Sequence, residues 1–442
     1  MYKKMTKCFK ISNSYYLGKE GDNCYQLYDK VKGKSYVITF KLYTILYLFY
    51  NSSNNIENIK EEFRKRGIDI KDFISLIKRD QFRDLFVEVN NTNTVSSFDN
   101  APCLSDWMGP ILNRVDFFIT KHCNLCCRHC FEGSAPTFKN KLFSQEDINS
   151  LVEQLKIANI QTLKITGGEP FSHPNIKQIL NKVSDAHFET IILTNATLID
   201  DECIGLIKSA NVQLGISLDG ITSDAHDYIR GKGAFDKTIA VLHKLSKEKI
   251  RFAITCSVTR KNWEQLVDLA DFVFNKINAE VLYLNRIRPM GRAQQSSIPM
   301  SDKENQKLSM IISNLKKSYK DKIILSDDSK IVCKTDSDKI HCAAGNTLLA
   351  IDDKFDVYPC VYGIGNANYK IGNILVDGVR KVWESSQWGI FRGHTKLSDL
   401  FDCRDCSFNK TCIMKNCRLK PVFEGKSFYS SISYCNKNND NI

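Results

Sequence analysis

The feature that most constrains the fold is a regular alternation of strand-like and helical segments between residues 115 and 285. Amphipathic stretches such as Ser144–Ala158 and Phe235–Lys249 separate short apolar runs. These runs predict parallel strands covered by helices, either doubly wound or as a partial barrel, with ligands at the carboxyl ends of the strands. The six strand-like runs are VDFFIT (115–120), TLKIT (162–166), TIILTN (190–195), VQLGISLD (212–219), RFAITCSVT (251–259) and EVLYLN (280–285).

The segments on either side predict two further domains. Within residues 1–100, strand-like pieces and three helical stretches suggest a small winged-helix-like fold. We place the α/β domain at 110–325. Residues 326–442 are rich in cysteine and poor in periodic segments, so we expect little apolar core there and stabilisation by metal. In the first domain, the expected strands are Cys24–Tyr28, Tyr36–Phe40 and Leu85–Val89, and the expected helices are Lys41–Asn51, Ile56–Arg66 and Ile70–Gln81.

Composition limits the class of protein. The 442 residues are too many for one hydrophobic core, and no apolar run approaches the roughly 20 residues of a membrane span. The N-terminus lacks the apolar core of a secretory signal, so we expect a cytoplasmic protein that does not enter a membrane. In a reducing compartment, 17 cysteines indicate metal or iron–sulfur ligation rather than disulfides. The formal net charge of +12 alone identifies no partner.

Three cysteines follow the first strand of the α/β domain in the motif C-x3-C-x2-C. Cys123, Cys127 and Cys130 fit a [4Fe–4S] cluster in which one iron has no protein ligand. Such an open iron can bind a substrate or cofactor. Spacing alone leaves two alternatives: a C-x2-C-x3-C motif through Cys126, or a zinc site completed by His122 or His129.

The cysteine motif, in this position, resembles that of the radical S-adenosylmethionine (SAM) superfamily. The motif T-G-G-E-P follows the second strand, as in that superfamily. The resemblance implies a partial (β/α)6 barrel in which this turn receives the methionyl amino group. Gly167 and Gly168 allow close backbone approach, and Glu169 offers a carboxylate to the ammonium.

Further positions match the superfamily one by one. Asn195 lies in L-T-N-A-T, where Ala196 replaces the glycine of the family's T-N-G-T. Ser217 and Asp219 lie in I-S-L-D-G, where the family contacts the ribose and carboxylate of SAM. Arg230, in H-D-Y-I-R-G, matches an arginine that pairs with the SAM carboxylate. The resemblance therefore implies a SAM-binding role for each.

The C-terminal region resembles a SPASM domain, which binds auxiliary iron–sulfur clusters. The spacing before Cys417 is one residue longer than the usual C-x3-C. The resemblance implies two [4Fe–4S] clusters, an inner and an outer one, besides the SAM-binding cluster. The fourth iron of the inner cluster is either bound by Cys333 or open. The outer ligands are Cys403, Cys406, Cys412 and Cys435, and the inner ligands are Cys342, Cys360 and Cys417. We expect the remaining cysteines to be small buried apolar residues, with the alternative for Cys126 that it tunes or shields the cluster. They are Cys8, Cys24, Cys103, Cys126, Cys203 and Cys256.

The first hundred residues resemble, in element order, the PqqD-like domains that bind leader peptides of ribosomally made, modified peptides. Such domains take the leader as an added strand at a sheet edge. A net charge of +5 (17 Lys and Arg, 12 Asp and Glu) favours an acidic leader. None of the predicted helices carries the clustered basic and amide side chains that read DNA, so we expect no nucleic-acid partner. A purely stabilising cap is the plainer alternative.

Together these resemblances imply an oxidoreductase that modifies a precursor peptide through a 5′-deoxyadenosyl radical. Oxidative side-chain cross-linking, by a C–C, ether or thioether bond, is the favoured outcome, with a reductase, ferredoxin or flavodoxin as electron donor. Formylglycine formation, as in anaerobic sulfatase maturation, is the enzymatic alternative, and a zinc-dependent binding protein is the alternative of another class. The sequence identifies no catalytic base. We expect Arg286–Gly291, after the sixth strand, to line the substrate mouth.

Overall fold

The computed structural model divides the chain into two compact units, Met1–Ile111 and Leu112–Ile442. In the first unit it describes the backbone of five strands. In the second unit it describes 112–325, 342–407 and 417–431, except residues 159, 185, 187, 288, 289, 297–299, 393 and 394. No helix in these described parts is long and apolar enough to cross a membrane.

The described strands of the first unit form two antiparallel sheets. β2 (Tyr15–Glu20), β3 (Cys24–Asp29) and β4 (Lys34–Ile38) pair in that order. β1 (Cys8–Ile11) pairs with β5 (Phe86–Val89). Three of these strands lie where the sequence predicts them, whereas β1 and β2 were not predicted. The three predicted helices lie outside the described residues.

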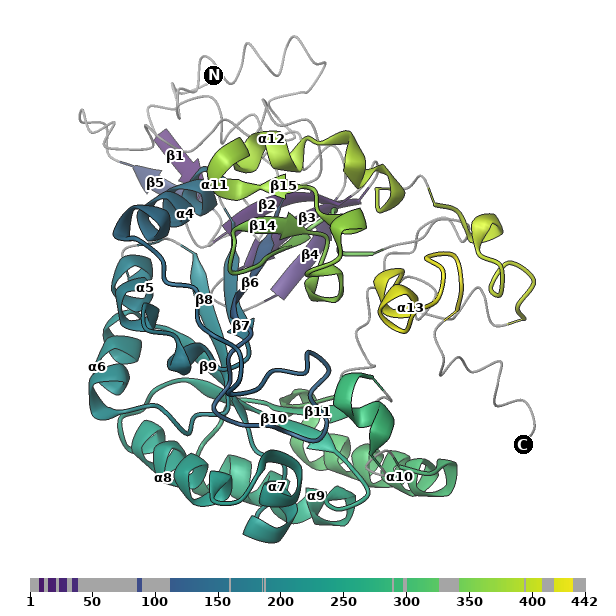
Figure 1. Cartoon of the computed structure of the whole chain (residues 1–442). Coiled ribbons are helices and arrows are strands. Elements are labelled where there is room, and N and C mark those ends of the chain that lie inside the picture. Colours follow the sequence, from purple (N-terminus) through teal and green to yellow (C-terminus); the bar gives the residue numbers. More distant parts are fainter. Residues whose placement is uncertain are drawn as a thin grey trace, which may run out of the picture. The chain divides into compact units, whose positions relative to one another are not determined.

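The second unit is built on a parallel sheet whose strands follow one another in chain order. Sequential neighbours with right-handed crossovers place all the connecting helices on one face, which excludes a doubly wound sheet. Figure 1 shows the strands as an arc with α4–α9 along its outer side. The parallel strands are β6 (Arg114–Thr120), β7 (Thr162–Gly167), β8 (Glu189–Thr194), β9 (Gln213–Ser217), β10 (Phe252–Val258), β11 (Leu282–Arg286) and β12 (Ile323–Leu325).

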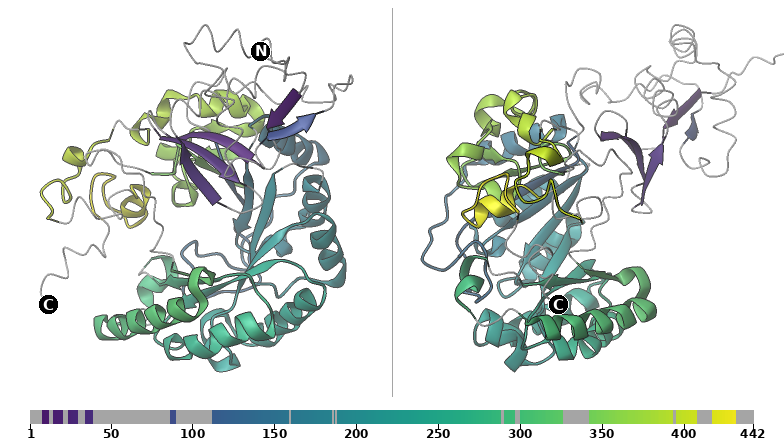
Figure 2. Two further views of the ribbon diagram at one scale, coloured as in Figure 1. Left: turned by 180° about the vertical axis from the view of Figure 1, so that it is seen from behind. Right: turned by 90° about the vertical axis from the view of Figure 1, so that its right-hand side faces the viewer.

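The helices bury one apolar stripe against this sheet. In α4, the Ser144 hydroxyl accepts from the Asp147 amide and the Asp147 carboxylate accepts from the Ser144 amide, a capping box that starts the helix. The buried side chains of α4 recur with helical spacing from Ile148 to Leu155. Figure 2 shows the helices on the outer face of the sheet from two further sides. They are α4 (Gln145–Ile157), α5 (Ile176–Val183), α6 (Asp201–Ser209), α7 (Ser223–Arg230), α8 (Ala234–Lys247), α9 (Leu266–Asp271) and α10 (Asp302–Tyr319).

The C-terminal region extends the same sheet. β13 (Leu348–Ile351) pairs in parallel with β6, and β14 (Asp356–Tyr358) and β15 (Gly372–Asn373) continue it with antiparallel pairing. The expectation of little apolar core here is wrong, because Trp383 and Trp388 are fully buried and pack together. The short helices of this region are α11 (Ile374–Asp377), α12 (Val379–Trp383) and α13 (Leu419–Phe423).

Candidate active site

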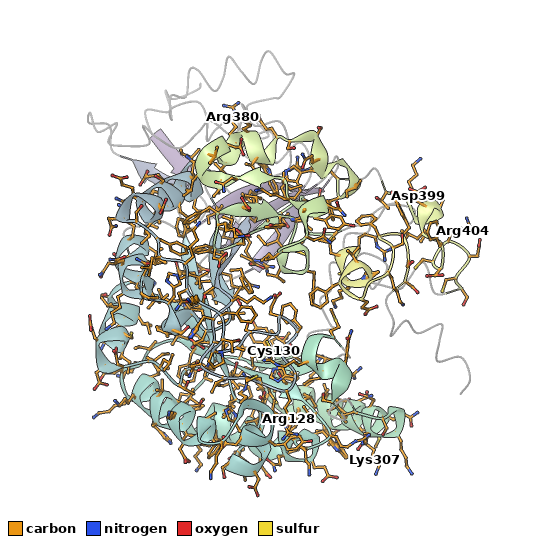
Figure 3. All side chains as sticks on the ribbon, in the orientation of Figure 1. Arg128, Cys130, Lys307, Arg380, Asp399 and Arg404 are labelled. Carbon is orange, nitrogen blue, oxygen red and sulfur yellow. The ribbon has the colours of Figure 1, made fainter. Side chains whose placement is uncertain are left out.

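The three motif cysteines lie on the loop that follows β6. Cys123 and Cys127 are buried, Cys130 is partly buried, and Cys126 is exposed. The Cys130 amide donates to the Cys127 carbonyl (3.2 Å) and the Cys123 amide to the Ala135 carbonyl (3.3 Å), so hydrogen bonds fix the loop at both ends. Figure 3 labels Cys130 and Arg128 of this loop. The exposure of Cys126 favours the C-x3-C-x2-C set over the alternative that includes it.

The surroundings of these thiols fit a bound cation. Burial, with smaller contributions from Glu169 and the two other thiols, raises the pKa of Cys123 to about 12. Burial also raises the pKa of Cys127, although the charge of Arg230 opposes this. Buried thiols of this kind become thiolates when a metal centre binds them. The donor set therefore fits an iron–sulfur cluster.

The zinc alternative fits less well. The His122 ring bonds the Ser172 hydroxyl (2.9 Å), and burial lowers the pKa of His129, whose Nε2 lies 3.3 Å from the Ser257 hydroxyl, to about 4. In the part of the chain that the structure describes, no three Cys, His, Asp or Glu side chains converge as one metal ion requires. A cubane cluster binds each thiolate to a different iron, so its ligands need not converge in this way.

The T-G-G-E-P turn packs directly on the cysteine loop. The Gly168 amide donates to the Thr120 carbonyl (2.7 Å), and the Glu169 amide donates to the His122 carbonyl (2.9 Å). A Cβ on Gly167 would overlap the Thr120 carbonyl oxygen, and one on Gly168 would overlap that of His122. Both glycines are therefore required by contact between the two loops.

Glu169 joins the ends of two strands. Its Oε1 accepts from the Phe171 amide (3.0 Å) and the Thr194 hydroxyl (2.7 Å), and Oε2 accepts from the Asn195 amide (2.8 Å). Burial raises the pKa of this carboxyl despite these bonds. Oε2 accepts one bond in the described residues, which leaves it capacity for an ammonium donor.

Asn195 faces the cysteine loop. Its Nδ2 donates to the Asn124 side chain (3.0 Å) and lies 3.9 Å from Cys123 Sγ. The next residue, Ala196, has a φ of +63°, which explains the glycine at this position of the family motif. Asn195 therefore contacts a candidate cluster ligand as well as lying at a strand end.

Asp219 and Arg230 form a buried ion pair. Arg230 Nε donates to Asp219 Oδ2 (2.6 Å), and Oδ1 accepts from the Ser257 amide (2.7 Å). The Asp219 side chain is fully buried, so in this structure its carboxylate holds Arg230 in place. Arg230 in turn lies near Cys127, whose thiolate its charge favours. Ser217 ends the adjacent strand β9 and is partly buried.

Among the C-terminal cysteines, the structure brings together Cys342, Cys360 and Cys417. Burial, with a smaller contribution from the thiol of Cys417, raises the pKa of Cys342 to about 12. Burial, Cys342 and Cys417 likewise raise the pKa of Cys360. The extra residue before Cys417 therefore does not keep it away from the other two.

Of the expected outer ligands, the structure describes Cys403 and Cys406. Cys403 is buried, and the Cys406 amide donates to its carbonyl (3.2 Å). Cys333, Cys412 and Cys435 lie outside the described residues. Of the six remaining cysteines, Cys203 and Cys256 are buried as expected. Cys126, for which a role beside the cluster was the alternative, is exposed. The side chains of Cys8, Cys24 and Cys103 lie outside the described residues.

Two parts of the chain match the profiles of known protein families. The profile of the radical SAM superfamily matches residues 117–273, and that of the SPASM iron–sulfur cluster-binding domain matches residues 342–407. The chain is a radical SAM protein with a SPASM domain. Its cofactors are SAM and a [4Fe–4S] cluster, together with auxiliary iron–sulfur clusters in the SPASM domain.

Two curated relatives differ in how much of the chain they match. The subtilosin biosynthesis protein AlbA of Bacillus subtilis (strain 168), named for an antilisterial bacteriocin, is 30% identical over 281 residues. This alignment spans 62% of this chain and 60% of the length of AlbA. An AdoMet-dependent heme synthase of Methanosarcina barkeri is 24% identical over 360 residues, which span 76% of this chain and 97% of that enzyme.

The fold of this radical SAM protein is similar to that of Streptococcus suis SuiB bound to the precursor peptide SuiA. The two superpose with a TM-score of 0.74 at 17% identity, over 97% of this chain and 99% of SuiB. The partial barrel expected from the sequence is confirmed by this similarity.

Three structural features of the radical SAM protein were missed by the sequence analysis. Phe131, beside Cys130, contacts Tyr362 and Phe423 of the C-terminal region, with ring centroids 5.6 and 5.8 Å away. Arg286 donates to Ser309 of α10 (3.2 Å), and Arg288 lies outside the described residues. Arg292, which follows the predicted mouth segment, bonds the cysteine loop. The one sequence signal for the contact of Arg292 with the cysteine loop is the motif P-M-G-R after the sixth strand.

Proposed function

We propose that this radical SAM protein oxidatively modifies a ribosomally made precursor peptide. The observation that carries the proposal is the extent of the similarity to SuiB, which was solved with its precursor peptide and aligns with 97% of this chain. The heme synthase aligns over almost its whole length and still leaves about a quarter of this chain without a counterpart. AlbA, by its name, also acts in the biosynthesis of a bacteriocin.

The first unit is proposed to bind the leader of that peptide, as a PqqD-like domain. β2 and β4 each have one strand neighbour among the described strands, so both are edges at which a peptide strand can add. The net charge of +5 over residues 1–100 favours an acidic leader. Leader recognition would give a function to the first unit, which the iron–sulfur clusters and SAM do not require.

The radical site is proposed to be held by Cys123, Cys127 and Cys130. When bound there, the cluster and SAM supply the reductive cleavage and the radical that removes a hydrogen atom from the peptide. Around them, Glu169 Oε2 is proposed to receive the SAM ammonium, and the guanidinium of Arg230, which bonds Asp219 through Nε, to receive its carboxylate. Gly167, Gly168, Asn195, Ser217 and Asp219 shape or support that pocket.

The C-terminal cysteines are proposed to hold two auxiliary clusters. Cys342, Cys360 and Cys417, with Cys333 or an open iron, form the inner site, and the remaining four form the outer one. A cross-link between two side chains removes two hydrogen atoms, so it needs an acceptor for a second electron, which such sites supply. A reductase, ferredoxin or flavodoxin is the proposed source of the first electron, in the reducing cytoplasm where so many thiols persist. The outer ligands are Cys403, Cys406, Cys412 and Cys435.

The test is peptide conversion by the anaerobically reconstituted full chain. Synthetic peptides from short reading frames beside its gene are incubated with dithionite and SAM and analysed by mass spectrometry. We expect one peptide to lose two hydrogen atoms only when its leader is present, and no change with a Cys123/Cys127/Cys130→Ala triple variant. Conversion of a cysteine or serine to an aldehyde without any leader would instead support formylglycine formation. SAM cleavage without change to any such peptide would contradict the proposal.

A further inference from the structure

The segment that follows β11 packs against the cysteine loop. Gly291 has a φ of +56°, and a Cβ there would overlap the carbonyl oxygen and Cα of Phe131 and the carbonyl oxygen of Cys130. Because neighbouring backbone leaves no room for a side chain, only glycine permits this contact. The contact places Arg292 beside the loop.

Arg292 bonds the cysteine loop at three backbone carbonyls. Its amide donates to Cys130 (3.1 Å), its Nε to Cys127 (2.8 Å) and its Nη2 to Ser134 (2.8 Å). The Cys127 carbonyl also accepts from the Cys130 amide. One residue from the segment after β11 therefore bonds both cysteines of this turn and the chain beyond it.

The shape of the guanidinium group makes this bridge possible. Nε and Nη2 donate in fixed directions from one plane, so a single side chain reaches two carbonyls seven residues apart in the loop. A lysine carries the same charge on a single nitrogen and cannot hold both carbonyls in the same geometry. The charge of Arg292 also favours the thiolate of Cys127.

We propose that Arg292 is a positioning residue of the radical site, holding Cys127 and Cys130 at the spacing that one cluster requires. This inference rests on the proposed ligation of a cluster by Cys123, Cys127 and Cys130. It adds a role for the segment that follows β11, a strand separated from β6 by β7–β10 in the sheet. Fork geometry, rather than charge alone, is the property that matters.

The test compares R292K and R292Q with the parent chain, all reconstituted without oxygen. The first readout is the rate at which a chelator removes the irons that the triple cysteine variant lacks. The second is the change that SAM causes in the electron paramagnetic resonance spectrum of the reduced protein, which reports the open-iron cluster. R260K, at a surface arginine that pairs with Glu304, is the matched control.

We expect R292K and R292Q to release these irons roughly tenfold faster or more, since each loses at least one charge-assisted hydrogen bond. The SAM-dependent spectral change should diminish in both, while the auxiliary irons and the R260K control stay as in the parent. Parent-like behaviour of R292K would overturn the proposal, because charge alone would then suffice. Loss of auxiliary iron as well would also overturn it, by showing a general structural role. A triple cysteine variant that keeps all its iron would instead defeat the proposed function itself.

Discussion

Gly168 lies at the closest contact between the turn after β7 and the cysteine loop. In the G168A variant, the new methyl group would meet the His122 carbonyl, which is backbone and cannot rotate away. Overpacking of this kind costs about 1–3 kcal/mol. We expect the variant to lose the irons of the radical site and keep the auxiliary ones. G205A, at a helical glycine with open space around its Cα, should keep all its iron.

Asp219 and Arg230 form a buried ion pair beside the site. D219N removes the countercharge of a buried guanidinium, so we expect it to lower the free energy of unfolding by about 3–5 kcal/mol at pH 7. D201N, at an exposed carboxylate that pairs with Lys244, should change it by less than about 1 kcal/mol. Denaturant unfolding of both variants measures the difference. Equal effects would contradict the structural role given to Asp219.

The pH dependence of this pair has a definite sign. Burial, the largest single cause, would raise the pKa of Asp219. The charges of Arg230, His129 and His226, together with the hydrogen bond from Arg230, hold the pKa below its ordinary value. A carboxyl with a lowered pKa stabilises the fold above its unfolded pKa of about 3.9, and this contribution is lost as the pH falls through the folded pKa. The difference in stability between the parent and D219N should therefore shrink below about pH 4. A difference that grew in acid would contradict this assignment.

For single residues, sequence motifs identified the candidate site residues but not the residues with which they form hydrogen bonds and ion pairs. Cys123, Cys127 and Cys130 could be selected because their spacing is local. Nothing local shows that Asp219 binds Arg230, or that Arg292 reaches Cys127, because these contacts depend on how distant segments pack. The sequence motif predicted Glu169 as a group that binds the SAM ammonium. Its hydrogen bonds to Thr194 and Asn195 could not be predicted, because they depend on the pairing of β7 with β8.

At the scale of elements, Gln154 of α4 links the barrel to the C-terminal region. Its Oε1 accepts from the Val379 amide at the start of α12 (2.7 Å). Q154A should leave this partly buried amide unpaired and lower the free energy of unfolding by about 1–3 kcal/mol. The amide of Val379 should exchange its hydrogen faster, whereas Q145A, at an exposed position of the same helix, should not affect it. Unchanged exchange in Q154A would contradict the link.

The elements themselves were predictable where periodicity is strong. The six expected strands correspond to β6–β11, and α4 (Gln145–Ile157) lies within the amphipathic stretch Ser144–Ala158 as expected. The parallel pairing of β13 with β6 was not, because it joins segments more than 200 residues apart and leaves no local signal. For the same reason, the buried tryptophans of the C-terminal region were not recognised as a core.

For the whole molecule, the two compact units predict separable functions. A variant that lacks residues 1–111 retains every cysteine proposed as a ligand. We expect it to keep its iron and cleave SAM, yet to lose conversion of the precursor peptide, because the leader has no binding domain. Iron content serves as the folding control. Conversion at the parent rate would contradict leader recognition by the first unit.

The central claim is that one chain carries a radical site and two auxiliary sites. The most direct test is to purify the parent and the Cys123/Cys127/Cys130→Ala variant without oxygen and measure iron, acid-labile sulfide and zinc per chain. Three clusters predict about 12 irons in the parent and about 8 in the variant. About 4 irons in the parent would contradict the auxiliary sites, and zinc without iron would contradict the account as a whole.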